Sequence, residues 1–135
     1  MKDGKDRSMI TLLTQDSRIS NVELSRKIGL TEGAVRARIE RLVKEGTIRR
    51  FTIETSEEAG SLAIVMVKAK GNTKAMMKDI ERLRLAQHSY EISGEFDGCL
   101  VIEGDGLEAI DRKIDLLRKL KNVHDTETFI VLKKW

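Results

Sequence analysis

Residues 20–46 read SNVELSRKIGLTEGAVRARIERLVKEG and predict two short helices joined by a tight turn. Ser20 is a favoured N-cap residue, and Glu23 lies three residues later, as in a capping box, so the first helix is expected to begin near Asn21. Gly29 has the conformational freedom that ends a helix and reverses the chain. This spacing is typical of a helix-turn-helix, which constrains the fold of everything around it.

The second of these helices has an apolar face and a polar, partly basic face. Thr31 is its expected N-cap and Gly46 its expected end. Its apolar positions are Val35, Ile39, Leu42 and Val43. The opposite face carries Glu32, Gly33, Arg36 and Glu40, with Arg38 and Arg41 at its flanks. These properties suit a helix that enters a DNA major groove with its first residues against base edges and its flanks against phosphates.

An ordinary solvated amphipathic helix in an all-helical domain would show the same pattern. The charge distribution favours the DNA interpretation. Residues 1–50 contain 12 Lys or Arg against 7 Asp or Glu, whereas residues 51–135 contain 13 against 15. The basic surplus therefore coincides with the predicted DNA-reading unit, as expected of a nucleic-acid surface.

The composition limits the other classes of function. There is no apolar run of membrane-spanning length and no signal sequence, because the first ten residues are mostly polar and charged. Cys99 is the only cysteine, so neither an intramolecular disulfide nor a multi-cysteine metal site is possible, and we interpret it as a small buried hydrophobic residue. We expect a cytoplasmic protein without membrane partners.

Two further segments complete the N-terminal part. Asp3 or Asp6 is expected to cap a first helix that ends near Asp16 and packs through Met9, Ile10, Leu12 and Leu13. Residues 47–55, TIRRFTIET, partly alternate apolar and polar residues and predict a short strand or wing. Arg49 and Arg50 at its start are candidates for phosphate contacts, although simple solvent exposure explains them equally well.

The rest of the chain predicts a second domain. Residues 56–61, SEEAGS, are the best boundary, and the continuous apolar run at residues 62–67 suits a strand covered on both faces. A helix capped by Thr73 should follow, then a strand at residues 88–93, the turn GEFDG and a strand at residues 99–103. A second helix is expected to place Leu107, Ile110, Ile114, Leu117 and Leu120 on one side, and DTETFIVLKKW closes the chain as a strand.

The predicted order is strand, helix, strand, strand, helix, strand, the split βαβ arrangement in which two helices cover one face of a four-stranded antiparallel sheet. The runs LAIVMV and FIVL are apolar at consecutive positions, so the second face also needs cover. The simplest cover is a second copy of the sheet. We therefore expect a homodimer whose helix-turn-helix units meet DNA half-sites about one turn, roughly 34 Å, apart.

The fold class is thus α+β. We expect a helix-turn-helix (winged-helix-like) DNA-binding domain at residues 1–50, a wing strand and linker at residues 51–61, and a ferredoxin-like βαββαβ domain for oligomerisation and effector binding at residues 62–135.

Three segments in this order give the chain its resemblance to a known family: ISNVELSRKIGLTEGAVRARIERLVKEGTI, the hairpin SGEFD and NVHDTETFIVL. The chain resembles the Lrp/AsnC family of feast/famine transcription regulators over nearly its whole length. The resemblance implies a dimer that binds pseudo-palindromic double-stranded DNA, often assembles into tetramers or octamers, and responds to an amino acid held between dimers. No other cofactor is implied.

The resemblance also assigns site residues. It places the recognition helix on residues 31–43 and the supporting helix on residues 21–28, and Arg38 and Arg41 match frequent family arginines. We expect DNA contacts from Ser20, Asn21, Thr31, Glu32, Gly33, Val35, Arg36, Arg38, Arg41, Arg49 and Arg50. The family's effector region maps onto Gly94, Glu95, Phe96, Asp97, Asp125, Thr126 and Thr128, with Asp97 as the candidate ammonium contact. Capping of the hairpin turn is an equally good role for Asp97.

The sequence also bears on three other functions: catalysis, RNA binding and architectural DNA binding. No catalytic or metal-binding constellation is found, because His88 and His124 lie far apart in sequence and neither a Gly-rich phosphate loop nor an HExxH pattern occurs. RNA-binding modules of the same βαββαβ order stack bases on sheet aromatics, which the expected third strand, CLVIE, lacks. An effector-independent architectural DNA-binding protein stays open, and it would show weak sequence preference and a large salt dependence.

Overall fold

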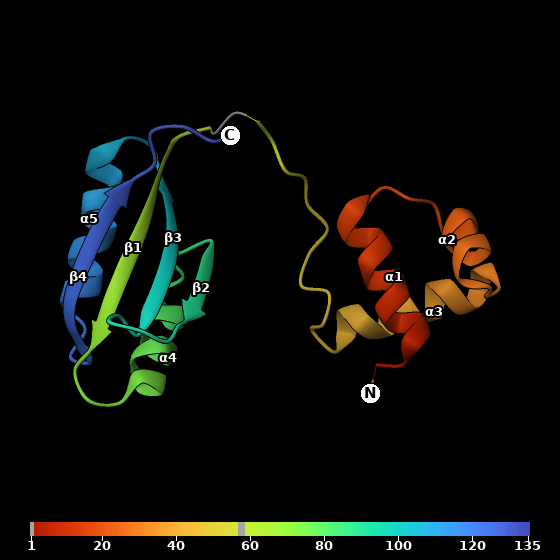
Figure 1. Cartoon of the computed structure of the whole chain (residues 1–135), viewed down its shortest axis with the longest axis horizontal. Coiled ribbons are helices and arrows are strands. Elements are labelled where there is room, and N and C mark those ends of the chain that lie inside the picture. The colour runs from red at the N-terminus through yellow and green to blue at the C-terminus, as the bar shows by residue number, and fades with distance from the viewer. Residues whose placement is uncertain (1, 57–58) are drawn as a thin grey trace. The chain divides into compact units, whose positions relative to one another are not determined.

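The computed structural model describes residues 2–56 and 59–135, which form two compact units that divide between Glu54 and Thr55 (Figure 1). The first unit contains three helices, α1 (Gly4–Gln15), α2 (Asn21–Ile28) and α3 (Glu32–Lys44). All three begin where the sequence predicts, after the N-caps Asp3, Ser20 and Thr31. Gly29, with φ of 67°, ends α2 in the left-handed conformation that glycine adopts without strain.

The reciprocal capping box forms at α1 rather than at α2. The Asp3 side chain accepts from the Asp6 backbone N–H, and the Asp6 side chain accepts from the Asp3 backbone N–H. At α2, the Ser20 hydroxyl accepts from the Glu23 backbone N–H at 3.1 Å, which is one half of the predicted box. The α1 box brings the Asp6 carboxylate back toward the start of its own helix.

The core of the first unit confirms most of the predicted apolar positions. Its buried residues are Met9, Leu24, Ile28, Val35 and Leu42, and Ile39 and Leu30 pack against them. Val43 was wrongly placed on this face, since it is 44% exposed. A step of one residue turns an α-helix by about 100°, so Leu42 and Val43 cannot both point into a narrow core.

The predicted strand or wing at residues 47–55 is wrong, because this segment is irregular throughout. Its first turn is held by the backbone N–H of Ile48, which donates to the Leu42 carbonyl at 3.0 Å, and the Ile48 side chain packs on the core. Phe51 and Ile53 remain exposed. A strand requires a neighbouring strand for its N–H and C=O groups, and the described residues of this unit form only helices and irregular segments.

The second unit contains β1 (Ser61–Ala69), α4 (Thr73–Leu83), β2 (His88–Glu91), β3 (Gly98–Gly104), α5 (Leu107–Arg118) and β4 (Val123–Ile130). The strands form one antiparallel sheet in the order β2-β3-β1-β4 (Figure 1), which confirms the predicted α+β architecture. Within the predicted linker, Glu57 and Glu58 lie outside the described residues.

Some predicted details of this unit need correction. The N-cap of α4 is Asn72 and not Thr73, because the Asn72 side chain accepts from the Ala75 backbone N–H at 3.0 Å. Strand β2 ends at Glu91 rather than Ser93, and β4 ends at Ile130, before the predicted end of the chain's last strand. Leu107 does not join the apolar side of α5 but is exposed at its first position.

The two faces of the sheet differ sharply. One face packs against α4 and α5 through buried side chains, among them Val65, Leu100, Met76 and Ile114. On the opposite face Ile64 of β1 and Phe129 of β4 are directly paired neighbours and are 38% and 50% exposed. Cys99, also on this face, is half-buried and not fully buried as predicted. The apolar run of β1 therefore has one dry face and one partly open face within the chain.

A buried carboxylate joins α1 to α3. Asp6 is the one fully buried charged side chain among the described residues. Its oxygens accept from Arg41 Nη2 at 2.8 and 2.7 Å and from Arg38 Nη1 at 2.9 Å. Both arginines belong to α3, so the charge of Asp6 fixes the third helix against the first.

The ionised form of Asp6 is favoured by these partners. Hydrogen bonds from Arg41, then from Arg38 and the Asp3 backbone, lower the pKa of Asp6 to about 2, although burial acts in the opposite direction. Because this value lies below the ordinary 3.8, the ionised carboxylate stabilises the fold fully above about pH 5. That contribution is lost as the pH falls toward 2.

Substitution of Asp6 by Asn should therefore destabilise the first unit in a pH-dependent way. At pH 7 we expect D6N to lower the free energy of unfolding by roughly 1–3 kcal/mol, because hydrogen bonds to a charged group are lost. The difference from wild type should shrink between pH 4 and pH 2, where the wild-type carboxyl also becomes neutral. Urea unfolding followed by circular dichroism measures both values.

The matched control is D16N, because Asp16 is exposed and an Asn oxygen retains its hydrogen bond from the Arg18 backbone N–H. D16N should stay within about 0.5 kcal/mol of wild type. An equal loss of stability for D6N at pH 3 and at pH 7 would contradict the role assigned to the ionised Asp6.

Candidate DNA interface and effector region

The exposed face of α3 carries most of the predicted base-contacting residues. Glu32, Gly33 and Arg36 are exposed, and Thr31 is exposed at the N-cap. Arg36 Nη2 lies 3.0 Å from Glu32 Oε1, and this ion pair joins residues one helical turn apart. The Arg36 side chain is 61% exposed and the Glu32 side chain is 48% exposed. Such a pair contributes little to stability, so either partner is free to exchange it for a hydrogen bond to a base edge.

Val35 cannot make the predicted DNA contact, because its side chain is fully buried in the core of the first unit. It belongs to the face that packs against the other helices, as its apolar spacing indicated. The exposed face instead includes Ala37, which the sequence interpretation missed. Ala37 follows Gly33 by four residues, and this spacing on the polar side of the helix was the available signal.

The structure gives Arg38 and Arg41 intramolecular partners that the sequence did not indicate. Arg38 Nη1 donates to both oxygens of Asp3, at 2.9 and 2.8 Å, as well as to Asp6. These bonds raise the pKa of Arg38, with Asp3 as the main cause, and the hydrogen bonds that Arg41 donates to Asp6 raise the pKa of Arg41. Arg41 also approaches Glu45 at 3.5 Å. Much of the positive charge counted on this helix is thus already balanced.

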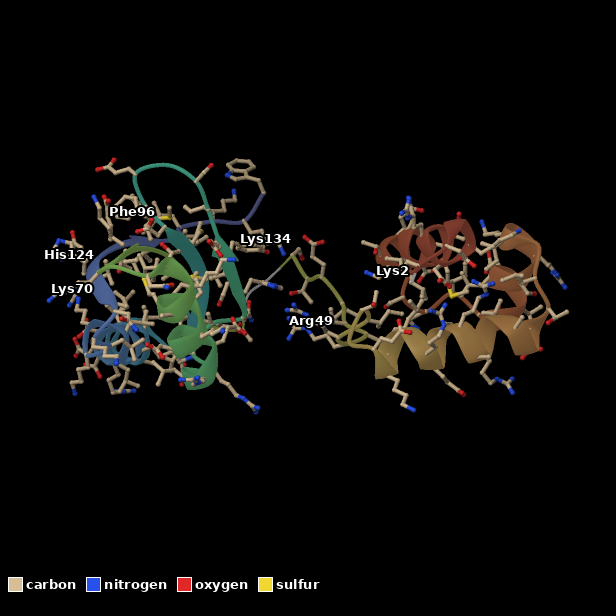
Figure 2. All side chains as sticks on the ribbon, turned by 90° about the horizontal axis from the view of Figure 1, so that it is seen from below. Lys2, Arg49, Lys70, Phe96, His124 and Lys134 are labelled. Atoms are coloured by element: carbon tan, nitrogen blue, oxygen red, sulfur yellow. The ribbon has the colours of Figure 1, made fainter. Side chains whose placement is uncertain are left out.

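The remaining predicted phosphate contacts lie at the ends of elements. Ser20 and Asn21 are at the N-terminus of α2, where backbone N–H groups and the helix dipole favour an anion. Arg49 and Arg50 are exposed in the irregular segment that follows α3, where Figure 2 labels Arg49. Neither arginine forms an ion pair within residues 2–56 and 59–135.

The predicted effector residues gather at one end of the sheet. Gly94, Glu95, Phe96 and Asp97 form the turn between β2 and β3, and Asp125 and Thr126 lie in the first half of β4. The turn is joined to the end of β1, because the Asp97 backbone N–H donates to the Val67 carbonyl at 3.0 Å. Since Val67 is paired with Thr126 and Lys68 with Asp125, both groups flank the end of β1. Figure 2 labels Phe96, Lys70 and His124 in this region.

The Asp97 side chain has a structural partner. Its Oδ2 accepts from the Ala69 backbone N–H at 2.7 Å, where the pairing of β1 with β4 shifts register. This bond fixes the hairpin turn to the end of β1, which is a structural role but not the local turn cap that the sequence left open. Oδ1 takes part in none of the hydrogen bonds of the described residues. One carboxylate oxygen is therefore available to a cation.

The two threonines of β4 differ in orientation from Asp125. Thr126 and Thr128 are paired with the helix-facing residues Val67 and Val65, whereas Asp125 is paired with Lys68 of the open face. The Thr126 hydroxyl accepts from Arg118 Nε at 3.2 Å. The predicted set is therefore divided between the two faces of the sheet, and Glu95, Asp97 and Asp125 carry its negative charge at and beside the turn.

Within the described parts of the chain, no group of three or more His, Cys, Asp or Glu side chains is placed to bind a metal ion. None of the described helices has the length and apolar character needed to cross a membrane. A groove of about 360 Å³ lies at the opposite end of the sheet from the effector region, between the start of β1 and the residues after β4, and its lining includes Leu62 and Leu132.

Each of the two units matches a known protein family. Residues 2–49 match the model of a winged helix-turn-helix DNA-binding family, and residues 62–135 match that of the Lrp/AsnC ligand binding domain. The HTH-type transcriptional regulator LysM of Sulfurisphaera tokodaii is 34% identical over 135 residues, covering 98% of this chain and 96% of that protein.

Solved structures share the fold. The leucine response regulatory protein of Mycobacterium tuberculosis has a TM-score of 0.79 at 22% identity, covering 99% of this chain and 94% of that one. A Neisseria meningitidis transcriptional regulator, solved as an L-Met complex, has a TM-score of 0.70 at 22% identity, covering 99% and 92%. With a helix-turn-helix followed by the family's ligand-binding domain, the chain belongs to the Lrp/AsnC family and is a DNA-binding transcriptional regulator.

Proposed function

We propose that the protein binds operator DNA as a homodimer and changes its assembly or affinity when an amino acid binds at the β2–β3 turn. The observation that carries this proposal is the exposed polar face of α3 beside Arg49 and Arg50, which form no ion pair with any described residue. Exposed donors and acceptors at the start of a helix read base edges, and exposed arginines nearby bind the backbone. As a regulator of transcription, the protein would act in the cytoplasm.

Base contacts are assigned to Thr31, Glu32, Gly33 and Arg36, and backbone contacts to Ser20, Asn21, Arg38, Arg49 and Arg50. Arg41 is the weakest candidate for a phosphate contact, because it supplies both of the shortest hydrogen bonds to buried Asp6. Removing it from Asp6 would leave a buried carboxylate short of donors, which costs far more than an exposed phosphate contact returns.

The homodimer is inferred from the open face of the sheet. Ile64, Phe129 and Tyr90 are large and exposed there, and the neighbouring Met66 and Val101 are only half-buried. A second copy of the same face would remove this apolar surface from water. Dimers of this kind can assemble further into tetramers or octamers, which would place two effector regions together.

The division of roles on the DNA side predicts different effects of two arginine substitutions. R36A should relax sequence preference at one base-pair position of each half-site, by about 1–3 kcal/mol, whereas R49A should weaken binding to all sequences and reduce the salt slope by about 0.9 per protomer. The operator is first selected from a random duplex library, and fluorescence anisotropy then measures affinity for it and for its point variants. K78A, on α4 of the other unit, is the control. Identical effects of R36A and R49A would contradict the assignment.

For the dimer, a charge placed at the centre of the open face should separate the copies. We expect the wild type to sediment as a dimer or larger, and I64E to sediment as a monomer, because a buried unpaired carboxylate is strongly unfavourable. K78E introduces the same side chain on an exposed helical position and should leave assembly unchanged. A monomeric wild type, or an I64E variant that still self-associates, would refute this interface.

The effector prediction rests on the free Asp97 oxygen. In a thermal-shift screen of the twenty amino acids, at least one should raise the melting temperature, by an amount equivalent to about 2.7 kcal/mol at 100 times its Kd. D97N should abolish the response, because the amide still accepts from the Ala69 N–H but carries no charge to attract an ammonium group. D111N, an exposed position on α5, serves as the control. A screen without any response would end this part of the proposal.

A further inference from the structure

One nitrogen of Arg38 donates to two carboxylates, of which one is buried and the other exposed. Its Nη1 donates to Asp3 and to Asp6, whereas its Nε and Nη2 take part in no hydrogen bond within the described residues. The Asp6 side chain has no exposed surface, while the Asp3 side chain is 53% exposed and that of Arg38 is 27% exposed. The guanidinium thus has an inner, buried anchor and an outer, hydrated partner.

This asymmetry decides which contact can be exchanged. If Asp6 lost its arginines, an ionised group would remain buried without compensation, which is strongly unfavourable. If Asp3 lost Arg38, its carboxylate would be rehydrated, and exposed pairs of this kind contribute little. The Asp3 carboxylate also accepts from the Asp6 backbone N–H, so it has a cap role that does not depend on Arg38. The outer contact is therefore the replaceable one.

A DNA phosphate presents the same recognition chemistry as the Asp3 carboxylate. A carboxylate is planar and a phosphate is tetrahedral, but each is an oxyanion that can accept two hydrogen bonds from a guanidinium. Arg38 lies on α3, one turn beyond Ala34 and two residues beyond Arg36, at the flank of the exposed face. Asp3 consequently accepts hydrogen bonds from the Nη1 end of the guanidinium, and places a negative charge beside it, where a backbone phosphate would be bound.

We propose that Asp3 is an affinity-setting residue that competes with the DNA backbone for Arg38, while Asp6 holds Arg38 and Arg41 in position. This inference rests on the proposed placement of the α3 flank against phosphates. Asp3 weakens the sequence-independent part of binding, and its removal leaves the base-contacting residues unchanged.

The test is a double-mutant cycle on DNA affinity in the full chain. D3N retains the N-cap, because an Asn oxygen accepts the same backbone hydrogen bond, but removes the competing charge. Against a labelled duplex of scrambled sequence, D3N should tighten binding about two- to fivefold and steepen the salt dependence by up to about 0.9 per protomer. R38Q alone should weaken binding. The double variant D3N/R38Q should bind DNA no more tightly through loss of the Asp3–Arg38 contact than R38Q does.

A matched charge control separates competition from net charge. D16N also removes one exposed carboxylate of the first unit without touching Arg38. Its gain in affinity should be smaller than that of D3N and should persist in the R38Q background. Equal gains for D3N and D16N, or a D3N gain that survives R38Q, would overturn the competition. An R38Q variant that binds as tightly as wild type would instead overturn the proposed placement of the α3 flank.

A measurement on the unmodified protein avoids any loss of stability in the variants. Arg38 lowers the pKa of Asp3 in the free chain, with a further contribution from the Asp6 backbone. Because that pKa lies below the ordinary 3.8, where the bases of duplex DNA are themselves protonated, the contact is followed at neutral pH. The carbon-13 chemical shift of the Asp3 carboxyl should change more than that of the Asp16 carboxyl when duplex DNA is bound, because the phosphate takes over Arg38. Equal changes for the two carboxyls would overturn the proposal.

Discussion

The first unit depends on one buried charge. Asp6 lies on α1, yet its oxygens are satisfied by Arg38 and Arg41 of α3, which are 32 and 35 residues further along the chain. An ionised carboxylate without exposed surface is stable only when donors of opposite charge are held in place. The apolar contacts of Met9, Leu24 and Leu42 are non-directional, whereas the two guanidinium groups specify orientation. The orientation of α3 relative to α1 is therefore fixed in part by the Asp6 contact.

Much of the fold could be predicted from local rules. Side-chain caps at Asp3, Ser20 and Thr31 and the glycine at position 29 set helix boundaries that hardly depend on distant residues. The succession of strands and helices along residues 61–130 followed from the alternation of strand and helical periodicity. Predictions failed where a tertiary partner decides the outcome: residues 47–55 have strand-like alternation, but none of the described residues forms a strand beside them. Val43 and Leu107 are apolar and correctly spaced, yet each lies at the margin of its helix's packed face.

The sequence was sufficient to locate the candidate site, but it did not show how much of the positive charge there is balanced by ion pairs. Residue types and spacing identified the polar face of α3, because that face follows the helical period. Charge counting overstated its positive potential, since Arg38 and Arg41 are balanced by Asp3 and Asp6. Pairs separated by more than 30 residues leave no local signal. The same limit applies to Asp97, whose partner, the Ala69 N–H, lies 28 residues away across the sheet.

The sheet shows why an apolar run alone does not identify what covers a strand. In β1, Val65 is fully buried against the helices, whereas its neighbour Ile64 is 38% exposed beside Phe129. Period-two alternation assigns these neighbours to opposite faces, and helices α4 and α5 are needed to cover only one. Keeping aliphatic and aromatic residues on the second face is unfavourable in water unless another surface meets it. The continuous apolar sequence of β1 therefore fits two different partners, the chain's own helices on one face and, in the proposed homodimer, a second copy of the chain on the other.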